Sequence, residues 1–273
     1  MNFFDVHSHI FPPGIAGKVI HELETYYGFR WQGSGLLDDL LRSLRTARIG
    51  RSVIFSCATK PAQVVSINNF IHSLQSQYPE LLTGFGTLHP DYEDFPAEIR
   101  RIRKLGLRGL KFHPDFQQFH IDDPKMMRVY GEVGGSLPML FHMGDPRTDF
   151  SSPVRLARVL ERFPHLTLIA AHMGGYTRWD EACEHLVGKP LYMDISSTIR
   201  LLTPEKTRKM VLAHGTGRIL FASDYPAVGH RKAVEDVLSL GLSEEDNEKI
   251  FHGNAEKLFN LVLPEERKII PAR

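Results

Sequence analysis

Eight short apolar runs, each bounded by glycine, proline or charge, recur along the 273 residues and constrain the fold more than any other feature. Amphipathic segments with helical spacing separate them. Apolar runs that alternate with helices predict parallel strands joined by crossover helices, and eight such units in this length predict an α/β protein with a (β/α)8 TIM barrel. We expect the strands near Asn2–His9, Ser52–Cys57, Leu82–Thr87, Leu107–His113, Pro138–Met143, Leu166–His172, Leu191–Ser196 and Ile219–Asp224.

The segments between the runs complete this organisation. A doubly wound open sheet is the alternative, but no Gly-x-Gly-x-x-Gly follows any run. No linker, repeat or low-complexity tract interrupts the pattern, so residues 1–273 are expected to form a single domain. Ser243, followed by three acidic residues, predicts the start of a C-terminal helix. Further helices are predicted at Leu36–Arg48, Pro96–Leu105, Pro124–Gly131, Val154–Phe163, Pro204–His214 and Lys232–Leu240.

The first connecting segment, Ile10–Gly35, is long: about 26 residues precede the first clear helix. It contains Pro12-Pro13-Gly14, two adjacent tyrosines, Arg30 and Trp31. In a barrel, the segment that follows the first strand lies on the catalytic face and could form a lid or a specificity wall. A surface excursion packed by its own aromatic side chains explains the segment equally well.

Four of the predicted strands end in a residue that can bind a metal. The first contains His7-x-His9, and residues two apart on a strand point to the same face, about 7 Å apart. The others end at His142, His172 and Asp224. Neutral imidazoles together with a carboxylate suit zinc, with manganese or iron as alternatives. Because barrel enzymes carry their sites at the C-terminal strand ends, the pattern predicts a metal centre there.

The alternation of side chains supports this interpretation. In the eighth strand Leu220, Ala222 and Asp224 share a face, and in the sixth His172 shares one with Leu168 and Ala170. On each of these strands the inward side chains would be apolar within the barrel and polar at the C-terminal end of the strand.

Asp5 has the parity of His7 and His9 and is expected one step deeper. There it would align a ligand histidine or pair with a buried lysine or arginine. Asp194 is also expected to face inward.

Six motifs are spread over nearly the whole chain. They are Asp5-Val6-His7-Ser8-His9-Ile10-Phe11-Pro12, Gly109-Leu110-Lys111-Phe112-His113-Pro114, Phe141-His142-Met143-Gly144, Ala171-His172-Met173-Gly174-Gly175, Phe221-Ala222-Ser223-Asp224-Tyr225-Pro226 and Gly253-Asn254-Ala255. In sequence and order they resemble the motifs of the amidohydrolase superfamily. More narrowly, the chain is similar to the amidohydrolase-related (amidohydrolase 2) branch, which includes aminocarboxymuconate-semialdehyde decarboxylase and uncharacterised metal-dependent hydrolases.

The resemblance implies a deformed barrel that holds a divalent metal, usually zinc. His7, His9, His142 and Asp224 match the positions of the family's ligands, and His172 matches the histidine that contacts the reacting water or the substrate. Asp224 would also accept a proton from that water.

Lys111 and His113, both inward on the fourth strand, have several candidate roles. The resemblance allows Lys111 to be carboxylated by CO2 and to bridge two metals. It could instead bind a substrate carboxylate or pair with Asp5. His113 is a candidate for contact with a second metal or the substrate. Candidate substrate-binding residues in the loops are Arg30, Trp31, Arg147, Arg178 and Tyr225, where solvated loop charge is the alternative for the arginines.

The leading functional hypothesis is a metal-dependent hydrolase in which a metal-bound hydroxide attacks an ester, lactone or amide carbonyl of a small substrate, which can be anionic. The alternative is a non-oxidative decarboxylase of an unsaturated or aromatic acid, which shares the opening motif. The Gly-Leu-Lys-Phe-His-Pro motif favours hydrolysis. A barrel that binds a small acid without turnover is a third hypothesis, and the intact ligand set argues against it.

The net charge and the cysteine content restrict the classes of partner and the location that we expect. A formal charge of +1 argues against nucleic acid or an anionic membrane as a partner, because no net field would attract either. Two cysteines and no recognisable secretion signal lead us to expect a reduced, cytoplasmic location. A homodimer would fit the resemblance, but no segment of the sequence can be identified as a subunit interface.

Overall fold

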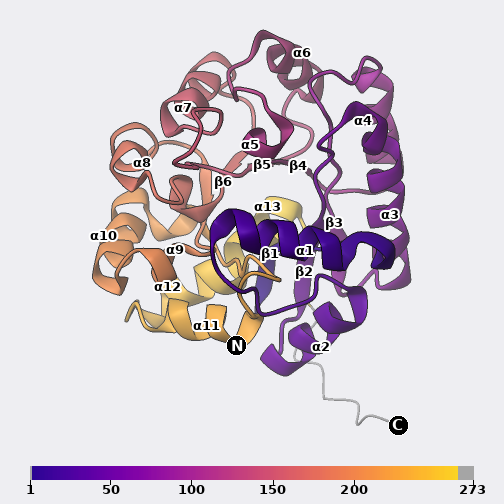
Figure 1. The fold of residues 1–273 in the computed structure, drawn as a ribbon. Coiled ribbons are helices and arrows are strands. Elements are labelled where there is room, and N and C mark those ends of the chain that lie inside the picture. Colours follow the sequence, from indigo (N-terminus) through magenta and orange to yellow (C-terminus); the bar gives the residue numbers. More distant parts are fainter. Residues whose placement is uncertain (1, 264–273) are drawn as a thin grey trace.

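Eight parallel strands form the centre of the protein in the computed structural model, which describes residues 2–263 (Figure 1). They pair in the orders β1-β2-β3 and β4-β5-β6-β7-β8. Backbone bridges from Gly86 to Leu110 and from Ser8 to Tyr225 join the two groups, so the sheet closes on itself and the predicted (β/α)8 barrel is confirmed. The strands are β1 (Phe4–His9), β2 (Arg51–Phe55), β3 (Leu82–Gly84), β4 (Leu110–Phe112), β5 (Met139–Phe141), β6 (Leu168–Ala170), β7 (Tyr192–Asp194) and β8 (Ile219–Leu220).

Helices surround this ring, and all six helices predicted between the strands are present. Ser243 caps the predicted C-terminal helix by accepting a hydrogen bond from the Asp246 backbone N–H. No helix within residues 2–263 is long and apolar enough to span a bilayer. The helices are α1 (Pro13–Tyr27), α2 (Leu37–Ala47), α3 (Val64–Gln77), α4 (Phe95–Lys104), α5 (Pro114–Gln117), α6 (Pro124–Val133), α7 (Pro153–Arg162), α8 (Trp179–His185), α9 (Thr198–Leu201), α10 (Pro204–His214), α11 (His230–Leu238), α12 (Glu244–Glu248) and α13 (Asn254–Phe259).

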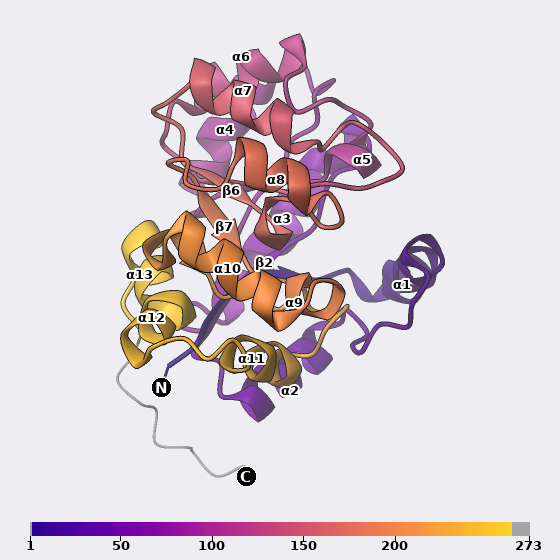
Figure 2. The same ribbon diagram turned by 90° about the vertical axis from the view of Figure 1, so that its left-hand side faces the viewer.

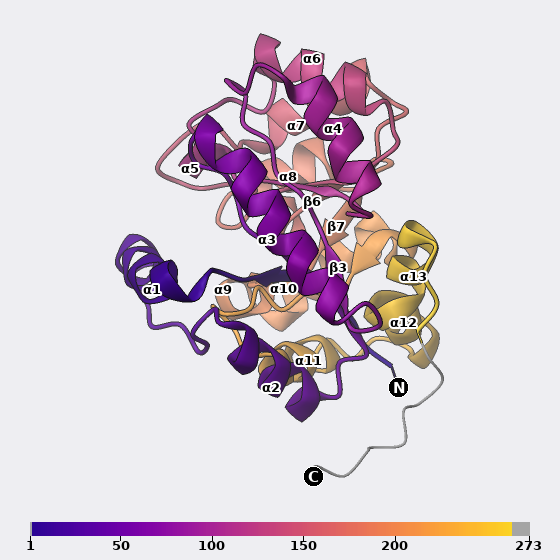
Figure 3. The same ribbon diagram turned by 90° about the vertical axis from the view of Figure 1, so that its right-hand side faces the viewer.

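Helix α1 corrects the prediction for Ile10–Gly35, because 15 of those residues are helical. Pro13 occupies the first helical position, where its missing N–H costs nothing. Gly28 ends the helix in a left-handed conformation. The helix lies across one end of the barrel, and α13 lies at the other end (Figures 2 and 3).

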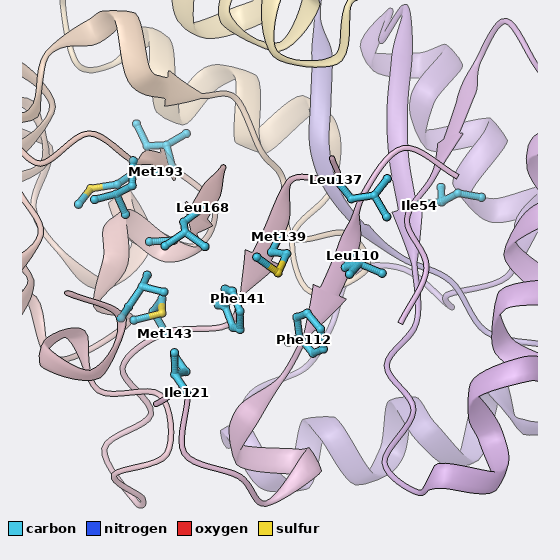
Figure 4. Close-up of a cluster of buried hydrophobic side chains, with 14 of the residues drawn as sticks. Ile54, Leu110, Phe112, Ile121, Leu137, Met139, Phe141, Met143, Leu168 and Met193 are labelled. Atoms are coloured by element: carbon cyan, nitrogen blue, oxygen red, sulfur yellow. The ribbon is translucent and has the colours of Figure 1, made fainter. Parts of the chain in front are cut away.

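Two clusters of buried apolar side chains show which strand residues point into the barrel and which point toward the helices. The inner cluster contains Val53, Leu140, Ile169 and Leu220, and α13 contributes Phe259 to it. The other cluster packs the outer faces of the strands against the helices, as Figure 4 shows for side chains that include Phe112, Phe141 and Leu168. The residues that point inward on β4, β5 and β7 are therefore Lys111, Leu140 and Asp194. The sequence predicts this direction for Lys111 and Asp194.

Strand β1 departs from simple alternation. Asp5 pairs with Ser52 and Ser8 pairs with Ile54, so three steps along β1 match two along β2. This β-bulge turns both Val6 and His7 inward and leaves Asp5 and Ser8 outside. The expected position of Asp5 inside the barrel is therefore wrong, because the extra residue inverts the alternation between Asp5 and His7.

Strand β6 gives a second correction. Ile169 and Ala171 belong to the inner cluster, whereas Leu168 and Ala170 belong to the outer one, the opposite of the predicted face. His172 still enters the site because its backbone leaves the strand with a φ of 58°, in the left-handed region. A turn, and not the strand, therefore aims this side chain.

Candidate metal centre

Three side chains at the C-terminal ends of β1 and β8 bring their donor atoms together: His7, His9 and Asp224. His7 Nε2 lies 3.2 Å from His9 Nε2 and 3.3 Å from Asp224 Oδ1, and the third edge of this triangle is 3.6 Å. Metal bonds of about 2.0–2.1 Å in a tetrahedron place neighbouring ligand atoms roughly 3.4 Å apart. These three residues, called the ligand trio below, therefore fit a zinc-sized divalent cation.

Hydrogen bonds from neighbouring residues fix the orientation of the His7 and Asp224 side chains within the trio. His7 Nδ1 donates a hydrogen bond to Asp194 Oδ2 at 2.8 Å, which leaves Nε2 unprotonated toward the other donors. Asp224 Oδ2 accepts a hydrogen bond from the Ser197 hydroxyl at 2.6 Å, so Oδ1 is the oxygen turned to the trio. Asp224 and Ser197 both have a positive φ, 64° and 53°. Backbone strain of this kind is common at functional sites.

Burial and nearby charge set the protonation of the trio. Burial lowers the pKa of His7 well below its ordinary value, and the Lys111 charge adds to this. Burial also lowers the pKa of His9. Burial alone would raise the pKa of Asp224, but the neighbouring imidazoles of His7 and His9 outweigh it and hold that pKa below its usual range. Two neutral imidazoles and a carboxylate are the forms that bind a divalent cation.

His142, the fourth predicted ligand, lies beside this group and not within it. Its Nδ1 is 3.0 Å from His172 Nε2, and its buried Nε2 has no hydrogen-bond partner among residues 2–263. The His142 ring stacks on His113 with centroids 3.9 Å apart and planes 10° apart. His142 as a ligand stays a prediction that needs its ring to turn toward the trio.

His113, Asp115 and His142 form a second group whose donor atoms lie within 4.8 Å of one another. All three side chains are buried. An imidazole binds a metal in the plane of its ring, and two stacked, nearly parallel rings cannot both point at one ion. In this conformation the group is therefore a poor cation site.

Lys111 is fully buried beside the trio, with Nζ 3.4 Å from His7 Nε2 and over the Phe55 ring. Burial lowers its pKa. Its predicted pairing with Asp5 is wrong, because Asp5 lies outside the barrel wall and bonds His230 Nε2 at 3.1 Å. Contact with the substrate or bridging by a carboxylated lysine remain predictions.

Asp5 also accepts the backbone N–H groups of His7 and Ser223, so it joins β1 to the chain after β8.

The predicted substrate-binding residues lie further out. Arg30 is 92% exposed and pairs with Glu24, and Arg178 pairs with Glu181. Arg147 pairs with Asp145 and covers the ring of Tyr26.

The two aromatic candidates face in different directions. Trp31 stacks on Tyr27 of α1, next to the site. The Tyr225 hydroxyl donates to Asp39, away from the trio, and its ring stacks on His230. Tyr225 there lines a surface hollow of about 350 Å³ between α2 and α11.

Sequence reasoning missed two tyrosines that approach the site histidines. Tyr27, at the end of α1, places its hydroxyl 3.1 Å from His113 Nε2. The Tyr176 ring lies 5.6 Å from those of Tyr27 and His172. The adjacent tyrosines of the first segment were the available signal for Tyr27, whereas nothing in the sequence singles out Tyr176.

A barrel with a His, His and Asp trio at its C-terminal strand ends is an arrangement typical of metal-dependent TIM-barrel enzymes. The profile of the family described as Amidohydrolase matches residues 5–261, and the chain belongs to this family.

Solved structures agree on the fold. An uncharacterized TIM-barrel protein from Bordetella bronchiseptica is similar with a TM-score of 0.78, 19% identity, and coverage of 95% of this chain and 99% of that one. A dihydroxybenzoic acid decarboxylase from Polaromonas sp. JS666, with bound manganese, has a TM-score of 0.74, 17% identity, and coverage of 95% and 97%. A probable 2-pyrone-4,6-dicarboxylic acid hydrolase from Acinetobacter baumannii has a TM-score of 0.70, 16% identity, and coverage of 96% and 100%.

Proposed function

We propose that the protein is a metal-dependent hydrolase that cleaves an ester, lactone or amide bond of a small substrate. The ligand trio of His7, His9 and Asp224 would hold the cation, zinc in the first place and manganese or iron as alternatives. Such a cation lowers the pKa of a water molecule and polarises a carbonyl oxygen. The remaining chemistry falls to residues of this chain.

The position of Lys111 is the observation that favours hydrolysis. Its Nζ lies 3.4 Å from His7 Nε2, with no ion-pair partner among the described residues. Acyl transfer builds negative charge on the carbonyl oxygen, and a nearby N–H donor stabilises that charge. Decarboxylation instead removes the charge of a carboxylate, so a donor that holds this carboxylate would stabilise the ground state and slow the reaction.

The other residues take complementary roles. Asp224 Oδ1 points toward the donor atoms of His7 and His9, where the cation would bind. This carboxylate would accept the proton of the attacking water and return it to the leaving group. His172 Nδ1 lies 2.9 Å from the Ser196 hydroxyl, which orients the ring. His172 would then hold the water or the carbonyl oxygen in place.

Decarboxylation is the second candidate. Tyr27, Trp31 and Tyr176 place flat rings near the site, which suits an aromatic acid. Similar structures include a dihydroxybenzoic acid decarboxylase as well as a probable 2-pyrone-4,6-dicarboxylic acid hydrolase. Both reactions use a divalent cation and a buried carboxylate, so the reaction itself must be measured.

The test is to load the protein with zinc or manganese and assay two substrate sets side by side. Esters, lactones and amides are followed by proton release, and aromatic or unsaturated acids by CO2 release. We expect hydrolysis by the wild type and a loss on the order of 10³-fold in Asp224→Asn, because that carboxylate is the base. Glu98→Gln, at a buried carboxylate of α4 that pairs with Arg101, is the control and should stay active. Release of CO2 without hydrolysis would establish the lyase instead.

A further inference from the structure

Tyr27 is the residue of α1 that reaches into the site. Its hydroxyl oxygen lies 3.1 Å from His113 Nε2. Its ring lies 6.4 Å from the His142 ring and 5.6 Å from the Tyr176 ring, measured between centroids. The helix that carries it crosses one end of the barrel (Figure 1). Tyr27 thus lies against His113 and His142, the histidines beside the ligand trio.

The hydrogen bonds of His113 determine which group donates to Tyr27. His113 Nδ1 accepts the backbone N–H of Phe116 and so caps α5. A neutral imidazole has one N–H, and here it must be on Nε2. Because Nδ1 accepts this bond, it carries no proton, and the ring is neutral. His113 Nε2 therefore donates to the Tyr27 oxygen.

This assignment leaves the Tyr27 O–H proton free to donate elsewhere. Within residues 2–263 the hydroxyl makes one side-chain hydrogen bond, the one with His113. A tyrosine hydroxyl keeps its proton near neutral pH. The Tyr27 side chain is partly exposed, so this proton can be donated to an oxygen of a ligand that enters the site.

We propose that Tyr27 is a substrate-binding residue whose O–H donates to a carbonyl or carboxylate oxygen at the end of the substrate remote from the cation. The proposal rests on the proposed function only for the cation, which would anchor the other end at the ligand trio. The substrate would then carry two oxygen-bearing groups, an acid or acyl group at the trio and a second carbonyl oxygen beneath α1. Tyr27 and the trio together would select for the distance between them.

The experiment measures binding to the zinc-loaded protein by calorimetry, without turnover. The probes are unbranched acids of three to five carbons in three forms: the monoacid, the acid with a terminal amide, and the diacid. The amide supplies a neutral carbonyl oxygen and the diacid a charged one. At one or more chain lengths, we expect the second oxygen to tighten binding about tenfold over the monoacid, because one buried hydrogen bond is worth this much.

The variants assign this difference to Tyr27. Tyr27→Phe keeps the ring and loses the donor, so it should bind all three forms of an acid equally. Thr25→Ala, which removes a hydroxyl of the same helix that bonds the His21 carbonyl, should keep the tenfold preference. Zinc content and circular dichroism establish that both variants are folded and loaded. A preference that persists in Tyr27→Phe, or that is missing from the wild type, would overturn the proposal.

Failure of this proposal and failure of the proposed function give different results. If Tyr27 binds the second oxygen but the protein only decarboxylates, the calorimetric preference remains while hydrolysis is absent. If the protein hydrolyses its substrate without help from Tyr27, hydrolysis remains and Tyr27→Phe binds every acid as the wild type does.

Discussion

Asp194 shows, at the scale of single residues, how much of the site depends on groups that would not touch the cation. Its Oδ2 accepts the Nδ1 proton of His7, and its Oδ1 accepts the backbone N–H of His172. One carboxylate therefore sets the tautomer of a ligand and the path of the chain after β6. The fully buried Asp194 carboxylate therefore acts by positioning its neighbours.

The first prediction concerns this carboxylate. Asp194→Asn would keep the Oδ1 acceptor but present an amide N–H to His7 Nδ1, so the imidazole proton would move to Nε2 and block metal binding. We expect zinc affinity to fall about 10- to 100-fold. Competition with a chromophoric chelator measures it, with Asp145→Asn as the buried control. An unchanged zinc affinity would show that the tautomer is fixed by other means.

His230 supports Asp5 outside the barrel wall, and both side chains are fully buried. His230 Nε2 bonds Asp5 at 3.1 Å, and its Nδ1 bonds the Ser43 hydroxyl at 2.7 Å. His230→Phe removes a hydrogen bond to a buried carboxylate while keeping the stack on Tyr225, so we expect a loss of about 2 kcal/mol in the free energy of unfolding. Urea unfolding tests this, and Ser43→Ala should cost less. Wild-type stability in His230→Phe would mean that the serines around Asp5 suffice.

At the scale of elements, the accuracy of the sequence interpretation depended on whether a strand stays regular. On β4, β5 and β7 the alternation is unbroken, and Lys111 and Asp194 face inward as predicted. On β1 the bulge inverts it at Asp5, and at His172 a left-handed turn overrides it. Bulges and left-handed turns of non-glycine residues depend on tertiary contacts, so one sequence carries no signal for them.

Contacts near the C-terminal end of α1 hold this helix across the barrel. The Tyr26 hydroxyl donates to Asp145 at 2.8 Å, and the Arg147 guanidinium covers the Tyr26 ring. Without the hydroxyl in Tyr26→Phe, we expect the amides of α1 to exchange about tenfold faster, because the hydrogen bond to Asp145 opposes local opening. Hydrogen exchange with mass spectrometry measures this. Thr25→Ala, which loses a bond within the same helix, is the control, and equal exchange in both variants would contradict the prediction.

At the scale of the whole molecule, the barrel gathers groups that would be easier to protonate in the unfolded chain. His7, His9, His113 and His142 are buried near one another, and burial lowers the pKa of each. They gather because the C-terminal strand ends of a closed barrel converge on one mouth. The folded protein without metal thus keeps neutral several imidazoles that the unfolded chain would charge.

The sign of the resulting pH dependence follows from proton counting. Below about pH 6.5 the unfolded chain binds protons at these four histidines, whereas the folded protein does not until their lowered pKa values are reached. The free energy of unfolding of the metal-free protein should therefore fall as the pH drops from 7 to 5, by up to about 1.4 kcal/mol per pH unit for each histidine. Urea unfolding across this range gives the slope, and His113→Gln should reduce it by one proton. Bound zinc should steepen the slope further, since protons then compete with the cation. A flat profile without metal would show that the histidines become charged in the folded protein, which would contradict their burial as neutral groups.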